Sequence, residues 1–183
     1  IQFEPNQREF APEVYGEAFK EAIEQARLYG NAVIVIRGHA DPAGTLNAML
    51  QAARAKGVLT RTGTPPNYKY FIDGKPLELN DTKKIVQLIE TGGLEGASPN
   101  PREVMQAALN LSLSRAEAVR EAIVKFAETQ NFRLEKAQIQ PVGVGIREPV
   151  IPVPRGDQGK ENMRVEFRLV KVKAEAEGGV LDF

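Results

Sequence analysis

The chain has 183 residues, of which 42% are hydrophobic and 26% are charged, with 24 basic and 24 acidic side chains. This composition is typical of a single globular domain with a packed core. A net charge of zero disfavours nucleic acid as the partner, because duplex binding depends on excess Lys and Arg. The longest apolar run is far shorter than the roughly 18 residues of a membrane-spanning helix. The absence of cysteine excludes disulfides and thiol chemistry.

The first part of the chain predicts a helix, a buried strand and a second helix. It opens on a strand-like segment without a signal peptide, so we expect it to be part of a longer precursor. Apolar residues recur at helical spacing over residues 12–29, and Gly30 and Asn31 close that helix. The β-branched run at residues 32–37 predicts a buried central strand. A further helix is expected at about residues 45–56.

An Asp-Gly pair near the middle of the chain predicts a β-hairpin. Residues 68–72 and 75–79 flank Asp73 and Gly74, and a type I′ turn needs positive φ at both central positions. Pro76 must then lie on an edge strand, because it has no N–H to donate.

After the hairpin the sequence predicts two helices, a final strand and a tail, and a third helix that is described below with its motif. A short helix is expected at residues 81–90, and Asn100-Pro101 has the pattern of an N-cap followed by a proline at the first helical position. We expect that helix to end near Leu109. Alternating apolar residues at 164–172 predict a strand with one buried face, and the acidic residues 174–183 predict a loosely held tail.

Two motifs place opposite charges at the ends of predicted elements. Residues 38–44 (Gly-His-Ala-Asp-Pro-Ala-Gly) put the Asp41 carboxylate just after the predicted central strand. Residues 111–119 (Leu-Ser-Leu-Ser-Arg-Ala-Glu-Ala-Val) predict a helix capped by Ser112, with Arg115 in its first turn. Such a pair suits a ligand with an ammonium and a carboxylate on one carbon, because arginine grips a carboxylate with two parallel hydrogen bonds. Without ligand, the two side chains are expected to pair with each other.

These motifs, in this order, resemble those of the OmpA-like peptidoglycan-binding domain, whose members carry G-H-[TA]-D-x-x-G and then L-S-x-x-R-A-x-x-V. Residues 1–6, 141–149 and 162–167 resemble other strands of that family. Residues 45–105 have no counterpart there, and we interpret them as an insertion in a single domain of residues 1–173, with both insertion ends at the binding face. The resemblance implies an α/β sandwich of β/α/β/α/β order, with helices on one face of a mixed sheet.

The resemblance also implies a function. It predicts a non-catalytic domain without a cofactor that binds the diaminopimelate residue of the peptidoglycan stem peptide. Such a domain anchors an envelope protein to the cell wall in the periplasm of a diderm bacterium. The parent protein is expected to be an outer-membrane protein, a lipoprotein or another membrane-anchored protein.

The resemblance also implies roles for individual residues that match the family's site positions. Asp41 and Arg115 match the two main ligand contacts, and Arg164 matches a last-strand arginine near the site. Gly38 and Gly44 match backbone positions that shape the loop.

The free N–H groups at the start of the predicted helix capped by Ser112 favour the same ligand carboxylate. Many members have an asparagine three residues before the Leu-Ser pair, where this chain has Ala108. Asn110 and Asn47 are the candidates to replace it.

Other functions stay open at this point. A protein–protein interaction module is the main alternative, with the hairpin aromatics Tyr68, Tyr70 and Phe71 as its contact surface, unless those rings pack within the insertion. A cell-wall hydrolase would need a second carboxylate beside Asp41, which no spacing singles out. His39 is the only histidine, and we expect it to be structural, because two side chains without a third are a weak metal site.

Overall fold

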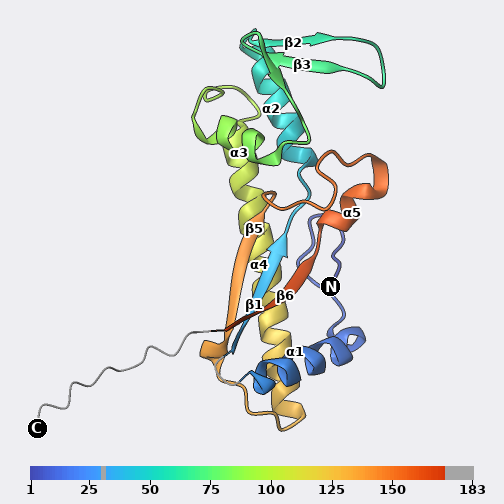
Figure 1. The fold of residues 1–183 in the computed structure, drawn as a ribbon, viewed down its shortest axis with the longest axis vertical. Helices are drawn as coiled ribbons and strands as arrows, with labels where there is room; N and C mark the ends of the chain where they lie inside the picture. Colours follow the sequence, from blue (N-terminus) through green and yellow to red (C-terminus); the bar gives the residue numbers. More distant parts are fainter. Residues whose placement is uncertain (30–31, 172–183) are drawn as a thin grey trace, which may run out of the picture.

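The structure, a computed structural model, describes residues 1–29 and 32–171. Gly30 and Asn31, predicted to close the first helix, and the predicted tail at 174–183 lie outside the described residues. A central sheet with helices packed on it forms the lower part of the molecule in Figure 1, and a smaller sheet with two helices forms the upper part. The site described below lies where the two parts meet.

The central sheet contains β1 (Ala32–His39), β5 (Ile139–Gly145) and β6 (Val165–Lys171), in the order β5-β1-β6. Strand β1 is parallel to β5 and antiparallel to β6, so the sheet is mixed, as predicted. Alternate residues of β1 are buried, because their side chains point to the face that the helices cover. The central strand therefore forms where the β-branched run predicted it and continues to His39.

Two helices cover this face of the sheet. The first is α1 (Gly16–Leu28), preceded by the 3₁₀ turn η1 (Pro12–Tyr15), and the second is α4 (Pro101–Thr129). Together with the sheet they form the first hydrophobic cluster, whose central members include Phe19, Ile23, Ile34, Ile36, Val119 and Ile123. The predicted α/β sandwich is confirmed.

The sequence predicted a helix break near Leu109, and this prediction is wrong. Helix α4 is continuous for 29 residues and runs along the long axis of the molecule (Figure 1). Ser112 lies inside it, fully buried, and its hydroxyl donates to the Leu109 carbonyl at 2.7 Å. A serine that bonds back to the preceding turn is compatible with the helix interior. The start at Asn100 and Pro101 is confirmed, since the Asn100 side chain accepts from the Arg102 N–H at 3.1 Å.

The second hydrophobic cluster is built mainly by residues 43–90. Its elements are α2 (Ala43–Ala55), β2 (Leu59–Thr62), β3 (Lys69–Ile72), β4 (Lys75–Leu77) and α3 (Thr82–Glu90). Met105 of α4 also belongs to this cluster, so α4 contributes to both.

The predicted hairpin is β3–β4. Asp73 and Gly74 have φ values of 49° and 75°, as a type I′ turn requires, and Pro76 lies on the edge strand of the order β2-β3-β4. Strand β2 was not predicted.

The N-terminal residues do not form the strand that the family resemblance predicted. Gln2 makes one isolated bridge to Arg164, and Phe3 N–H donates to the Met163 carbonyl at 2.8 Å. Pro5 has no N–H, and Asn6 has a φ of 57°, so the backbone turns away from the sheet. The segment instead runs past the end of β1. Short elements complete the chain: η2 (Lys136–Gln138), η3 (Gly156–Gln158) and α5 (Gly159–Asn162).

Candidate functional site

A cavity of about 430 Å³ lies beyond the end of β1, between the two hydrophobic clusters. Its walls come from the N-terminal segment, the loop from β1 into α2, the α4 face around Arg115, and the α5 region. Thr45 and Val104 both line it, so the two ends of the block at 45–105 do meet at this site. The volume is within the range of small-ligand sites.

Asp41 is held in one orientation at the cavity wall. It follows β1 and is half-buried, and its Oδ1 accepts a hydrogen bond from Asn162 Nδ2 at 3.2 Å. Asn162 is fully buried; its Oδ1 also accepts from the N–H groups of Val150 and Ile151, at 2.8 and 3.0 Å. A Cβ at Gly159 would lie 2.7 Å from Asp41 Oδ2, so glycine leaves room for the carboxylate.

Arg115 lies on α4 in the wall of the same cavity and has no exposed surface. Its guanidinium donates to three backbone carbonyls: Nε to Gln7 at 2.8 Å, Nη1 to His39 at 3.2 Å and Nη2 to Glu4 at 3.0 Å. Burial lowers the pKa of Arg115 to about 10, and it stays charged at neutral pH. The expected pairing with Asp41 is wrong, because within the described residues no carboxylate lies within 4 Å of Arg115.

Arg115 is also not in the first turn of a helix. Because α4 begins at Pro101, the N–H groups around Ser112 belong to a continuous helix and are not free for a ligand. Helix α2 does begin at the cavity, and its first turn contains Gly44 and Thr45. The Thr45 hydroxyl is buried without a hydrogen-bond partner among the described residues.

The cavity carries both signs of charge. Asp41 and Asp157 line it as acids, and Arg115 and Lys160 line it as bases. Lys160 also reaches Glu4 at 3.2 Å, in an exposed ion pair. A cavity with separated acidic and basic groups can accept a zwitterion, each end meeting its opposite charge.

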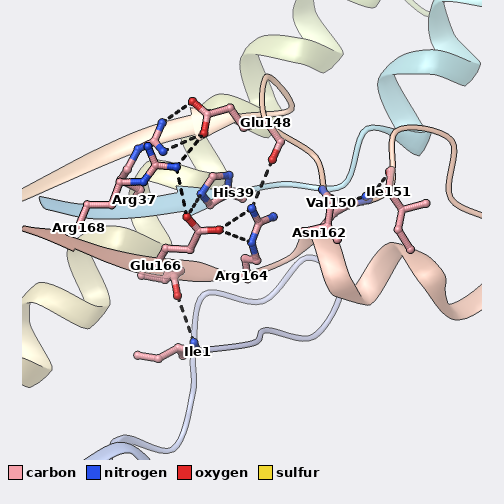
Figure 2. A network of polar contacts seen from close by, with 11 residues as sticks. Ile1, Arg37, His39, Glu148, Val150, Ile151, Asn162, Arg164, Glu166 and Arg168 are labelled. Carbon is pink, nitrogen blue, oxygen red and sulfur yellow. Dashed lines mark hydrogen bonds and ion pairs between the residues drawn. The ribbon is translucent and has the colours of Figure 1, made fainter. Parts of the chain in front are cut away.

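Three of the predicted ligand contacts do not line this cavity. Arg164 turns toward Glu166, with its Nη2 2.6 Å from Oε1 (Figure 2). The Ser112 hydroxyl accepts the Gly145 N–H at 2.9 Å, and Asn110 accepts from Gln106 on the exposed side of α4. The other candidate, Asn47, lies outside the cavity on α2, whereas Ala108 lines it.

His39 is buried, as expected, in a network of charged groups on the sheet. Its Nε2 lies 3.6 Å from Glu166 Oε2, and neither ring nitrogen makes a hydrogen bond within the described residues (Figure 2). Burial, together with the nearby Arg164 charge, lowers the His39 pKa from 6.5 to about 4, although Glu166 opposes the shift. The ring is therefore neutral at pH 7.

Sequence reasoning missed Asn162 and Thr45 as site residues. Asn162 belongs to a stretch that resembles the family's last strand, but nothing in the sequence shows that its side chain contacts Asp41. The residues that the structure describes contain no group of three potential metal ligands, and none of their helices is long and apolar enough to cross a membrane.

Comparisons with known proteins support the architecture. No protein-family model and no curated protein matches the sequence. Among solved structures, the chain is similar to the crystal structure of the peptidoglycan-associated lipoprotein from Burkholderia pseudomallei. The identity is 14%, the TM-score is 0.50, and the match covers 93% of this chain and 88% of that one. At this identity the similarity concerns the fold: the chain has an OmpA-like α/β sandwich fold.

Proposed function

We propose that this domain binds peptidoglycan without catalysis, by gripping the zwitterionic end of diaminopimelate in the cavity between Asp41 and Arg115. The observation that carries the proposal is the buried Arg115 cation, which has no carboxylate partner in the part of the chain that the structure describes and lies in the wall that it shares with Asp41. A buried charge is costly unless it is hydrogen-bonded and paired, and Arg115 has carbonyl acceptors but no counter-charge among the described residues. The fold supports the proposal, since the similar structure is that of a peptidoglycan-associated lipoprotein.

The two side chains have capacity left for a ligand. A guanidinium has five N–H groups, and three of those of Arg115 have carbonyl acceptors. Two of these acceptors, the carbonyls of Glu4 and Gln7, belong to exposed residues of the N-terminal segment. The ligand carboxylate takes the remaining N–H groups, or displaces one of these carbonyls. Asp41 accepts from Asn162 through Oδ1 only, so its Oδ2 is the acceptor for the ligand ammonium.

The same proposal predicts where in the cell the protein acts. A domain that binds peptidoglycan acts in the cell envelope, and we infer that it tethers a membrane-anchored parent to the wall in the periplasm. One small zwitterion gives modest affinity, and repeated sites on the wall polymer raise the avidity. The block at 45–105 remains, in this proposal, an insertion in a single domain.

The test measures binding of a diaminopimelate-containing stem peptide by calorimetry, together with co-sedimentation with purified sacculi. Asp41→Asn and Arg115→Lys are each expected to weaken binding by about 2–5 kcal/mol, because each leaves an opposite charge poorly paired in the site. Asp73→Asn is the matched control for Asp41→Asn, since Asn-Gly also suits the hairpin turn. Arg133→Lys, on an exposed residue, is the control for Arg115→Lys.

A lysine-type stem peptide separates the diaminopimelate proposal from general wall binding. It lacks the carboxylate beside the terminal ammonium, so it is expected to bind much more weakly than the diaminopimelate peptide. Equal affinity for both peptides would contradict the role of Arg115. Unchanged affinity in folded Asp41→Asn would contradict the site, and the interaction-module alternative would then be the better one.

A further inference from the structure

A second cavity, which the proposed function does not use, lies along α2. It has a volume of about 570 Å³, and we call it the α2 groove. One wall is a face of α2, and the other is formed by side chains of β2 and β3, which project beyond α2 in Figure 1. The lining residues are Asn47, Leu50, Gln51 and Arg54 of α2 and Leu59, Arg61 and Tyr70 of the small sheet. All of them belong to the block at 45–105, so the family pattern does not predict this groove.

The groove begins close to the first cavity. Gly44 lines the first cavity, and Asn47, Gln51 and Arg54 line the groove. Because these four residues are spaced by three and four, they share one side of α2, and all four are exposed. At 1.5 Å per residue, the helix rises about 4.5 Å from Gly44 to Asn47 and about 15 Å from Gly44 to Arg54. A ligand that leaves the first cavity over Gly44 therefore meets the wall of the groove.

The charges of the groove favour an anionic ligand. Arg54 and Arg61 give it two positive charges, and none of the acidic residues that the structure describes lines it. Neither arginine forms an ion pair among the described residues. The Arg61 guanidinium lies 4.0 Å from the centre of the Tyr68 ring, and this stacking restricts its movement.

The uncharged lining suits a peptide with small apolar side chains. Leu50 and Leu59 are half-buried against the second hydrophobic cluster, so they form an apolar floor. The side-chain amides of Asn47 and Gln51, linked at 3.2 Å, offer donors and acceptors for peptide bonds. Tyr70 lies directly opposite Arg61 in the β2–β3 pair, so its ring shares the groove face of the small sheet.

The stem peptide has matching chemistry beyond its diaminopimelate zwitterion. In the peptide alanine–γ-glutamate–diaminopimelate–alanine, the glutamate is linked through its side chain, so its α-carboxylate is free. The uncrosslinked peptide ends in a second free carboxylate. About ten bonds separate the glutamate carboxylate from the carbon of the zwitterion, an extended span of about 12 Å. This span is close to the rise of about 15 Å between Gly44 and Arg54, and the Arg54 side chain covers the remaining distance.

We propose that the α2 groove binds the rest of the stem peptide, with Arg54 and Arg61 contacting its two free carboxylates; this rests on the proposed function for the identity of the ligand. The two amides contact the peptide bonds, and the apolar floor contacts the alanine methyl groups. The groove thus extends recognition from one zwitterion to its neighbours in the same peptide, and it selects stem peptides whose glutamate is not amidated. An unrelated acidic peptide fits less well, because it leaves the first cavity empty.

The experiment compares two ligands by calorimetry. One is the stem tetrapeptide with both carboxylates free, and the other is the same peptide with the glutamate α-carboxylate and the C-terminal carboxylate converted to amides. Both keep the diaminopimelate zwitterion. The proteins are the wild type, the double variant Arg54→Gln/Arg61→Gln and the control Lys125→Gln/Arg133→Gln, whose exposed residues line neither cavity and change the net charge equally. Circular dichroism verifies that each variant is folded.

The wild type and the control are expected to bind the free acid about three- to tenfold more tightly than the diamide, because each exposed ion pair contributes modestly. The double variant should bind both peptides alike, with the affinity of the wild type for the diamide. Equal binding of both peptides to the wild type, or the same preference in the double variant, would overturn the proposal. Binding of pentaglutamate as tight as that of the tetrapeptide would also overturn it, because the groove would then be a general anion site.

Asp41→Asn separates this proposal from the proposed function. If Asp41→Asn abolishes binding while the wild type does not distinguish the two peptides, the groove assignment fails and the proposed function stands. If Asp41→Asn binds the tetrapeptide as tightly as the wild type and keeps the preference for the free acid, the proposed function fails and the groove remains a peptide site. Absence of binding of either peptide to the wild type would overturn both.

Discussion

Lowering the pH from 7 to 5 should destabilise this protein mainly through His39. Its pKa is about 4 in the folded protein and about 6.5 in the unfolded chain. As the pH falls through 6.5, His39 becomes protonated in the unfolded chain but stays neutral in the folded protein. Protonation therefore stabilises the unfolded chain, and the free energy of unfolding decreases toward low pH. Integrating the two titrations gives a loss of about 2 kcal/mol in the free energy of unfolding between pH 7 and 5.

His39 is the main side chain that titrates in this pH window, and the comparison with a variant separates it from the Ile1 amino group, whose pKa burial lowers from 8.0. The chain has a single histidine and no cysteine, and carboxylates titrate mainly below pH 5. Urea unfolding at several pH values therefore measures the His39 effect as the difference between the wild type and a variant without the imidazole. The matched variant is His39→Leu. We expect the site to accept leucine, because neither ring nitrogen of His39 has a hydrogen-bond partner among the described residues. Between pH 7 and 5 its free energy of unfolding should fall by about 2 kcal/mol less than that of the wild type.

A nuclear magnetic resonance titration of the one imidazole checks the cause. Resonances that move with a midpoint near 4 agree with the burial argument. A midpoint near 6.5, or the same pH slope in wild type and His39→Leu, would refute it.

Two further predictions concern packing around the site. Gly38→Ala should cost more than about 3 kcal/mol of stability in thermal or urea unfolding, because a Cβ there would lie 1.8 Å from the Ser112 carbonyl oxygen; Gly93→Ala, with open space around it, is the control, and equal stability of both variants would contradict the contact. Asn162→Ala should cost about 2–4 kcal/mol, since it leaves the Val150 and Ile151 N–H groups without an acceptor. Asn110→Ala, at an exposed position of α4, is the control in the same assay; an Asn162→Ala variant as stable as this control would contradict the role given to Asn162.

Local chemistry was enough to predict much of the fold. The β-branched run gave β1, the Asp73-Gly74 pair predicted the β3–β4 turn, and Asn100-Pro101 predicted the start of α4. Each of these signals acts over a few residues, so it can be seen in the sequence without knowing the tertiary structure.

The predictions were wrong where contacts between residues far apart in the sequence determine the local structure. Ser112 has a strong preference for helix caps, but its burial against the sheet keeps it inside α4. The acceptors of Arg115 are 108, 76 and 111 residues away in sequence, so no spacing could have predicted them. The placement of Asp41 and Arg115 in one cavity was predictable only from the family pattern. The contact of Asn162 with Asp41 depends on how the segment at 149–162, which includes η3 and α5, folds back.

The continuity of α4 has a consequence for how the site recognises its ligand. A 29-residue helix is about 43 Å long at 1.5 Å per residue, and it belongs to both hydrophobic clusters. The two clusters cannot separate or close on each other without bending this helix, which contains neither proline nor glycine after Pro101. The width of the cavity is thus set during folding. A ligand that enters it meets a preorganised receptor, and selectivity rests on fit rather than on closure.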